Sequence, residues 1–223
     1  MARNSTDTRE RLVETALRLF RSEGYQATTM RRIATETGVS LGNAYYYFAG
    51  KEELVHELYL VVQREHRALA LPRLREDAPL EDNLRAVLHS GIDVMAPYHG
   101  FGATFVQTAL PSTSPASPFS ERSGEARTMA VDLMRQAVTA SRHRPSRSLQ
   151  TQLPTLLWLA YLGVTLHWVS DGSPDQERTR VLVDRVSPVI AKAVNLSRLP
   201  IARGLVDDIV RLTETLGTRA VTR

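Results

Sequence analysis

Residues that can donate hydrogen bonds to phosphate oxygens are concentrated in one short stretch near the amino end of the chain. They are Thr28, Thr29, Ser40, Asn43, Tyr45, Tyr47 and Lys51. The hydroxyl and amide side chains stand at the beginnings of stretches with helical patterning, where free backbone amides attract anions without needing formal charge. The tyrosines add phenolic O–H donors and the lysine adds a cation. This combination indicates contact with a phosphate backbone.

A second group of residues in the same stretch is suited to reading nucleic-acid bases. It comprises Arg31, Leu41, Gly42 and Tyr46. The guanidinium fork of Arg31 matches the O6 and N7 atoms of guanine, with a phosphate contact as the alternative. Leu41 can touch a thymine methyl, Gly42 permits close backbone approach, and Tyr46 can stack or hydrogen-bond. A helix in the major groove of DNA makes contacts of these two kinds.

Both groups lie on two predicted short helices joined by a tight turn. The first helix follows an N-cap at residues 27–29 and carries an apolar stripe at helical spacing. That stripe consists of Met30, Ile33 and Ala34. Gly38 ends the first helix, and Ser40 caps a second helix that is almost free of charge. The pattern predicts a helix-turn-helix.

An earlier amphipathic helix is expected to support this pair. It runs from near Asp7 to Glu23, with Gly24 as its C-cap residue. The predicted core of the resulting three-helix unit is Phe20, Tyr25, Ile33, Val39, Tyr45 and Phe48. We therefore assign residues 1–51 to a DNA-binding domain and residues 52–223 to a second, larger domain.

The motif resembles the N-terminal signature of the TetR family of bacterial transcription regulators over roughly residues 8–55. The matching positions are Gly24, Tyr25, Thr28, Thr29, Ile33, Ala34, Gly38, Val39, Ser40, Gly42, Tyr45, Phe48, Lys51 and Leu54. In the family, the positions of Thr29, Asn43, Tyr45, Tyr47 and Lys51 commonly hold phosphate, and many members have His at the position of Tyr47. The resemblance implies a homodimer on a double-stranded, pseudo-palindromic operator.

Composition excludes several other classes of protein. The chain has 223 residues, is 43% hydrophobic and contains no cysteine, so disulfides and thiolate chemistry are ruled out. Its N-terminus is polar and lacks the apolar stretch of a secretory signal, which favours a cytoplasmic location. The formal net charge of +4 is too small to identify a DNA-binding protein, so the motif carries that inference.

The rest of the chain is predicted to be helical, which makes the fold class all-α. A long helix from Lys51 to about Leu71, ended by Pro72, joins the two domains. Further helices are expected at Leu80–Met95, His99–Ala109, Glu121–Ser141, Leu149–Val169, Pro174–Leu196 and Ile201–Leu216. Pro- and Ser-rich stretches at residues 111–118 and 144–146 are predicted loops.

The apolar stretch at residues 153–169 resembles a membrane span but is better explained as a buried helix. It is short for a span, begins beside Pro154 and is followed directly by a polar segment. Two stripes follow its helical spacing. We predict that the bulky stripe, with Trp158 and Tyr161, faces the domain interior. The other stripe is our candidate dimer interface and comprises Leu157, Ala160, Gly163, Val164 and His167.

The TetR resemblance also implies that the larger domain binds a small-molecule effector, most simply an apolar or aromatic one. Such a site is a cavity lined by aromatic side chains with a few polar tips. The candidates are Met95, Tyr98, His99, Phe101, Phe105, Trp158, Tyr161, Thr165 and Trp168. Ordinary core packing is the alternative for each of them. No cofactor and no bound metal is expected.

The function that the TetR resemblance implies is a ligand-responsive regulator, and the resemblance favours a repressor over an activator. An architectural DNA-binding protein without a ligand is the main alternative. A helical metalloenzyme is a remote one, since Glu53 and His56 have the spacing used in di-iron bundles, but the second such pair is missing. No other catalytic constellation is present, so we expect no enzymatic activity.

Overall fold

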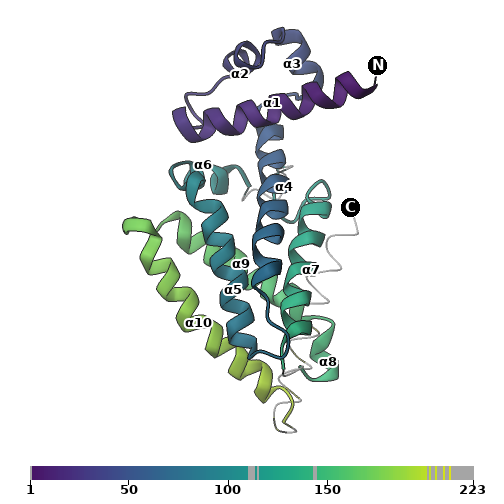
Figure 1. The fold of residues 1–223 in the computed structure, drawn as a ribbon, viewed down its shortest axis with the longest axis vertical. Coiled ribbons are helices and arrows are strands. Elements are labelled where there is room, and N and C mark those ends of the chain that lie inside the picture. Colours follow the sequence, from purple (N-terminus) through teal and green to yellow (C-terminus); the bar gives the residue numbers. More distant parts are fainter. Residues whose placement is uncertain are drawn as a thin grey trace. The chain divides into compact units, whose positions relative to one another are not determined.

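The computed structural model describes residues 2–109, 114, 116–142, 145–199, 201, 204, 208 and 211, and every named element in them is helical (Figure 1). The α-helices are α1 Ala2–Glu23, α2 Met30–Thr37, α3 Leu41–Tyr47, α4 Lys51–Ala70, α5 Leu80–Met95, α6 His99–Ala109, α7 Gly124–Ala140, α8 Arg147–Gln150, α9 Leu153–Val169 and α10 Glu177–Leu196. Short 3₁₀ helices are η1 Leu71–Arg73, η2 Ala96–Tyr98 and η3 Pro174–Gln176. The all-α prediction is confirmed.

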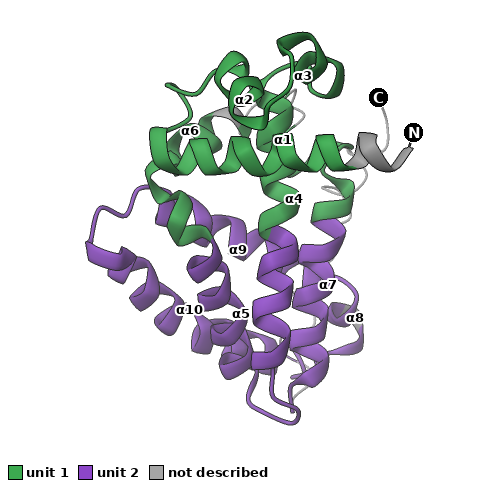
Figure 2. Cartoon of the chain, turned by 45° about the horizontal axis from the view of Figure 1, so that its top comes forward, with its two compact units in different colours: residues 1–62, 95–126 green, residues 63–94, 127–223 purple. Residues whose placement is uncertain are grey.

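The chain divides into two compact units (Figure 2). Unit 1 combines residues 1–62 with residues 95–126, and unit 2 combines residues 63–94 with residues 127–223. Helix α4 begins in unit 1 and ends in unit 2. The units are defined by which residues pack together. The predicted boundary after residue 51 separates a DNA-binding domain from the larger domain, and it stays a proposal.

Helices α2 and α3 form the predicted helix-turn-helix because each begins with a capping residue and a glycine ends the first. The Thr29 hydroxyl oxygen accepts a hydrogen bond from the backbone N–H of Arg32, which caps α2. Gly38 ends α2 in the left-handed conformation at φ 75°, and its N–H binds the carbonyl oxygens of Ala34 and Thr35. A two-residue link then leads directly into α3.

The core of unit 1 is built where α1 crosses the motif. Phe20, Ile33 and Phe48 are almost fully buried. The Phe20 ring lies 5.2 Å from that of Tyr25 and 5.5 Å from that of Phe101, centroid to centroid, so α6 completes this core. Burying these side chains favours folding by about 1.5–3 kcal/mol each, before the conformational entropy is counted.

One predicted member of that core is wrong. Tyr45 is 50% exposed, whereas its neighbour Ala44 is fully buried. Successive residues of an α-helix point about 100° apart, so a helix that buries Ala44 must turn Tyr45 outward. Val39 is only half-buried. The small alanine lets α3 approach the other two helices closely.

In unit 2, the structure places most helices where the sequence predicts them. The bounds of α5 match the prediction, as do those of α6 in unit 1. The expected helix from Leu149 is interrupted before Pro154 and becomes α8 and α9. Proline lacks a backbone N–H and is tolerated in the first turn of a helix, so a new helix begins there. The helix expected at Ile201–Leu216 lies mostly outside the described residues.

Helix α9 buries the bulky stripe that the sequence assigns to the domain interior, although Gly163, Leu166 and His167 on its other side are exposed. Trp158, Tyr161 and Trp168 are each at most 3% exposed. Gly91 of α5 is required beside Tyr161, because a Cβ atom there would lie 2.7 Å from the tyrosine ring and hydroxyl. His66 of α4 is 1% exposed and packs against the same ring at 5.1 Å between centroids. Helices α4, α5 and α9 therefore share one core.

Candidate nucleic-acid interface

The outward face of α3 is uncharged and aromatic. Tyr46 is 80% exposed, Gly42 and Asn43 are exposed, and Leu41 is half-buried. The Tyr46 and Tyr47 rings pack edge to face at 5.2 Å between centroids, so each supports the other. A solvated surface helix usually carries charges, whereas this one offers aromatic and backbone surface. That composition suits a groove with mixed polar and apolar edges.

Helix caps prepare two of the predicted phosphate donors. The Ser40 hydroxyl oxygen accepts the backbone N–H of Asn43 at 3.1 Å, and the Thr29 oxygen accepts that of Arg32 at the same distance. Because each oxygen is used as an acceptor, its O–H hydrogen remains available to donate outward. The two caps thus present donors beside backbone amides at the beginnings of α2 and α3.

Thr28 does not belong to this set, although the sequence placed it there. Its side chain is fully buried, and its hydroxyl donates to the carbonyl oxygen of Gly24 at 2.8 Å. Of two adjacent threonines only one can occupy the N-cap position, and that residue is Thr29. Thr28 instead closes the turn between α1 and α2.

Arg31 and Arg32 differ in their surroundings. Arg32 forms ion pairs with Glu36 at 2.9 Å and with Glu23 at 3.2 Å. Arg31 is exposed and forms no ion pair with any residue in the described part of the chain. Its guanidinium therefore keeps its full charge and all its donors for a ligand, which agrees with its selection as the base-reading arginine.

Lys51 has a structural role besides any contact with DNA. Its Nζ donates to the carbonyl oxygen of Tyr25 at 2.8 Å and lies 4.2 Å from the centre of that ring. Burial lowers the pKa of Lys51, with the nearby Glu52 carboxylate acting in the opposite direction. Since an ammonium has three N–H donors, further donors remain for phosphate. Lys51 thus ties the start of α4 to the turn after α1.

The junction of α3 and α4 is held by Glu53. One carboxylate oxygen accepts the backbone N–H of Ala49 at 2.8 Å, and the other accepts the Arg122 guanidinium at 3.0 Å. The bond from Ala49 is the main cause that lowers the pKa of Glu53, burial opposes it, and Arg122 adds to the lowering. Residue 122 therefore reaches the segment that positions α3. Its role escapes sequence analysis because no local pattern links it to Glu53.

His56 lines a small cavity of about 150 Å³ beside that junction, together with Arg9 and Glu57. Burial lowers the pKa of His56; Glu57 and Glu125 oppose the shift, while Arg122 and Arg9 add to it. Glu53 and His56 are not part of a metal site among the described residues. Within these ranges no cluster of three or more His, Asp or Glu side chains can hold a metal ion. The geometry is that of a packed junction.

Two family sequence profiles match the chain. The profile described as "Bacterial regulatory proteins, tetR family" matches residues 12–58, and the one described as "Tetracyclin repressor-like, C-terminal domain" matches residues 83–212. The chain belongs to the TetR family. It is therefore a DNA-binding transcription regulator with a helix-turn-helix, in a family of regulators rather than enzymes.

Individual TetR-family relatives agree with this assignment. KstR2, an HTH-type transcriptional repressor of Mycobacterium tuberculosis, is 28% identical over 173 residues, covering 74% of this chain and 83% of KstR2. A TetR regulator from Nitrosomonas europaea has the same fold, with a TM-score of 0.57 at 18% identity over 81% of this chain and 96% of that one. FadR of Thermus thermophilus has a TM-score of 0.55 at 22% identity over 86% and 95%.

The candidate effector residues of this TetR-family chain do not form one set. Met95, Tyr98, His99, Phe101 and Phe105 belong to unit 1, whereas Trp158, Tyr161, Thr165 and Trp168 belong to unit 2. Phe101 stacks on Phe20 and so packs the DNA-binding unit. The unit 2 aromatics are buried on α9. Their role in binding an effector stays a prediction.

The predicted dimer stripe on α9 is wrong at two positions. Leu157 and Val164 are 3% and 5% exposed within one chain, so they pack inside it. Gly163 and His167 are exposed, and Ala160 is half-buried. Leu166, which is absent from the predicted stripe, is 49% exposed on the same outward side. A helix that is apolar all round gives no phase signal, so its outer face could not be identified from spacing alone.

None of the helices in the described ranges is both long enough and apolar enough to cross a membrane.

Proposed function

We propose that this TetR-family chain is a repressor that binds a pseudo-palindromic operator as a homodimer and is released by a small effector. The observation that carries the proposal is the uncharged, aromatic face of α3, exposed through Tyr46 and framed by capped helix N-termini. Such a surface fits a major groove between two phosphate backbones. That KstR2 is named a repressor favours repression.

The proposed DNA contacts are those predicted from the sequence, without the buried Thr28. Base edges are read by Arg31, Leu41, Gly42 and Tyr46. Phosphates are held by Thr29, Ser40, Asn43, Tyr45, Tyr47 and Lys51. The exposure of Tyr45 supports its proposed contact with phosphate, because its phenol is exposed rather than packed in the core.

The proposed dimer uses the outer faces of α9 and α10. Leu166 on α9 and Val181 and Val189 on α10 are 49%, 41% and 63% exposed, although all three are aliphatic. The two helices pack together, and His167 Nδ1 lies 2.9 Å from Thr179 Oγ1 between them. A second copy is the proposed occupant, because one α3 covers few base pairs and an inverted repeat needs two related by a two-fold axis.

The proposed effector acts by shifting a conformational equilibrium. A ligand that binds better to a conformation with the wrong half-site spacing lowers operator affinity, and operator DNA lowers ligand affinity by the same factor. Helix α4 is the proposed lever, because it runs from the DNA-binding unit into unit 2. The Thermus thermophilus FadR structure is a complex with lauroyl-CoA, which supports effector binding as a property of this fold.

The experiment that tests the proposed function is retention of fragmented genomic DNA by the purified chain, followed by sequencing. An inverted repeat should be enriched, and Tyr46→Ala should abolish the enrichment without changing the thermal stability. A matched control is Tyr59→Phe, since Tyr59 is a buried tyrosine of α4 outside the proposed interface. Retention of fragments without any common inverted repeat would contradict the proposal.

A further inference from the structure

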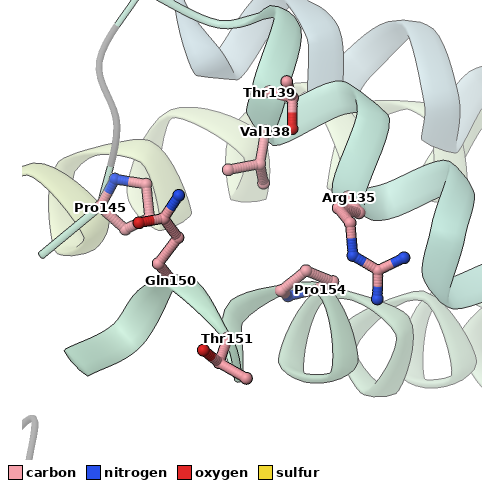
Figure 3. Close-up of a pocket in the computed structure, with 7 residues that line it drawn as sticks. All are labelled: Arg135, Val138, Thr139, Pro145, Gln150, Thr151 and Pro154. Carbon is pink, nitrogen blue, oxygen red and sulfur yellow. The ribbon is translucent and has the colours of Figure 1, made fainter. Parts of the chain in front are cut away.

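Unit 2 contains a cavity whose lining includes none of the candidate effector residues. Its volume is about 350 Å³, within the range of roughly 300–1,000 Å³ typical of small-molecule sites. Helix α7 supplies Arg135, Val138 and Thr139 to its wall. Pro145, the end of α8 and Pro154 of α9 form the opposite wall (Figure 3). Side chains from three consecutive helices therefore face one space.

The described residues that line the cavity combine the cationic side chain of Arg135 with neutral donors and apolar surface. Gln150 and Thr151 supply an amide and a hydroxyl, neither of which forms a side-chain hydrogen bond with the described part of the protein. Val138, Pro145 and Pro154 supply the apolar surface. None of the described residues that line the cavity is acidic. Its chemistry therefore favours an anion attached to a short apolar body and disfavours a cation.

The charge of Arg135 is only partly compensated. Its NH1 pairs with Asp132 at 3.0 Å, but the same carboxylate also accepts Arg67 at 2.7 Å and Gln136 at 2.8 Å. Two guanidinium groups thus share one carboxylate, which leaves one positive charge in excess. The Arg135 side chain is 55% exposed, so its unused N–H donors are accessible. A planar guanidinium can hold a carboxylate by two parallel hydrogen bonds.

We propose that this cavity binds a small amphipathic carboxylate, with Arg135 holding the carboxylate and the Val138, Pro145 and Pro154 surface holding its apolar part. Gln150 and Thr151 supply further hydrogen bonds at the rim. The inference deepens the proposed function, on which it rests for its regulatory meaning, by naming the chemical class of one effector. Binding itself requires only unit 2 and can be measured without DNA.

The test is calorimetric titration of the full chain with hexanoate, hexan-1-ol and inorganic phosphate. Hexanoate should bind at least tenfold more tightly than either of the other two, because only it satisfies both the cation and the apolar wall. Arg135→Gln should weaken hexanoate binding at least tenfold. The matched control Arg178→Gln removes an exposed arginine of α10 that does not line the cavity, and it should bind hexanoate like the wild type.

A second variant protects the test against misfolding of the first. Gln150 is exposed at the cavity rim, so Gln150→Phe fills the space without changing any charge and should abolish hexanoate binding while the melting temperature stays the same. Unchanged hexanoate affinity in either variant, or equal affinity for hexan-1-ol, would overturn the inference. Retention of operator fragments by the wild type is measured separately, so failure here leaves the DNA-binding proposal standing.

Discussion

Arg31 and Arg32 are adjacent on α2 but differ in what their charges already contact. Arg32 shares two carboxylates, Glu36 and Glu23, whereas Arg31 has no ion pair in the described ranges. Arg31→Ala should therefore weaken operator binding by about 1–3 kcal/mol and relax the preference at one base pair. Arg32→Ala should leave base preference unchanged, because its guanidinium is already paired with Glu36 and Glu23. These ion pairs are exposed, so they contribute little to folding stability. Selection from a random duplex library with both variants measures this difference.

An Arg31→Ala variant that loses affinity equally for all duplexes would show that Arg31 holds phosphate instead. The alternative that the sequence left open would then be correct. A loss of base preference in Arg32→Ala would contradict the assignment from the other side.

His66 makes the stability of unit 2 sensitive to acid. Burial lowers its pKa to about 4, with the bond to the Val87 carbonyl opposing, against an ordinary value of 6.5. Below pH 6.5 His66 binds a proton in the unfolded chain but stays neutral in the folded chain. The free energy of unfolding therefore has its full value near pH 7.5 and falls as the pH drops toward 4. The expected loss at pH 4.5 is about 2–3 kcal/mol. Urea unfolding at both pH values measures it.

His66→Leu isolates this contribution, because other titrating groups are common to both proteins. The leucine variant should lose about 2–3 kcal/mol less than the wild type between pH 7.5 and pH 4.5. Equal losses in the two proteins would mean that His66 is protonated in the folded state.

Substitutions at two glycines of the helix-turn-helix should affect folding stability and operator binding differently. Gly38 has φ 75° and no atom within 4 Å of an added Cβ, so Gly38→Ala should destabilise by about 1–2 kcal/mol through backbone strain alone. Gly42 is helical and equally uncrowded, so Gly42→Ala should stabilise by up to about 1 kcal/mol. Gly42→Ala should nevertheless weaken operator binding, because its methyl group stands on the proposed reading face. Thermal unfolding and a mobility-shift titration check both parts.

A stabilised Gly42→Ala that binds operator like the wild type would remove Gly42 from the interface. The two variants control for each other, since both add one methyl group to the same motif.

Sequence patterns predicted elements better than the orientation of their side chains. Caps at Thr29 and Ser40 and the left-handed Gly38 are local features, so α2 and α3 were predictable from neighbouring residues. The outward turn of Tyr45 was not, because a helix of two turns gives too few residues to establish its buried face. The bond from Arg122 to Glu53 joins residues 69 positions apart, and no pattern announces such a pair.

Binding to an inverted repeat, as proposed, requires two copies of the chain. Leu166 and Val189 are exposed aliphatic residues on α9 and α10, the proposed dimer face. The double variant Leu166→Asp, Val189→Asp should be monomeric and should lose most of its operator affinity while retaining its helical content, since neither side chain is part of the core. Sedimentation velocity and circular dichroism check this. A double variant that remains dimeric would place the interface elsewhere.

The number of chains bound to one operator duplex tests whether the protein binds DNA as a homodimer. Sedimentation equilibrium of the wild-type chain with a duplex that carries the enriched inverted repeat should give two chains per repeat, and a duplex with one half-site scrambled should bind far more weakly. One chain per duplex, or equal affinity for the scrambled duplex, would show that the protein does not bind an inverted repeat as a homodimer.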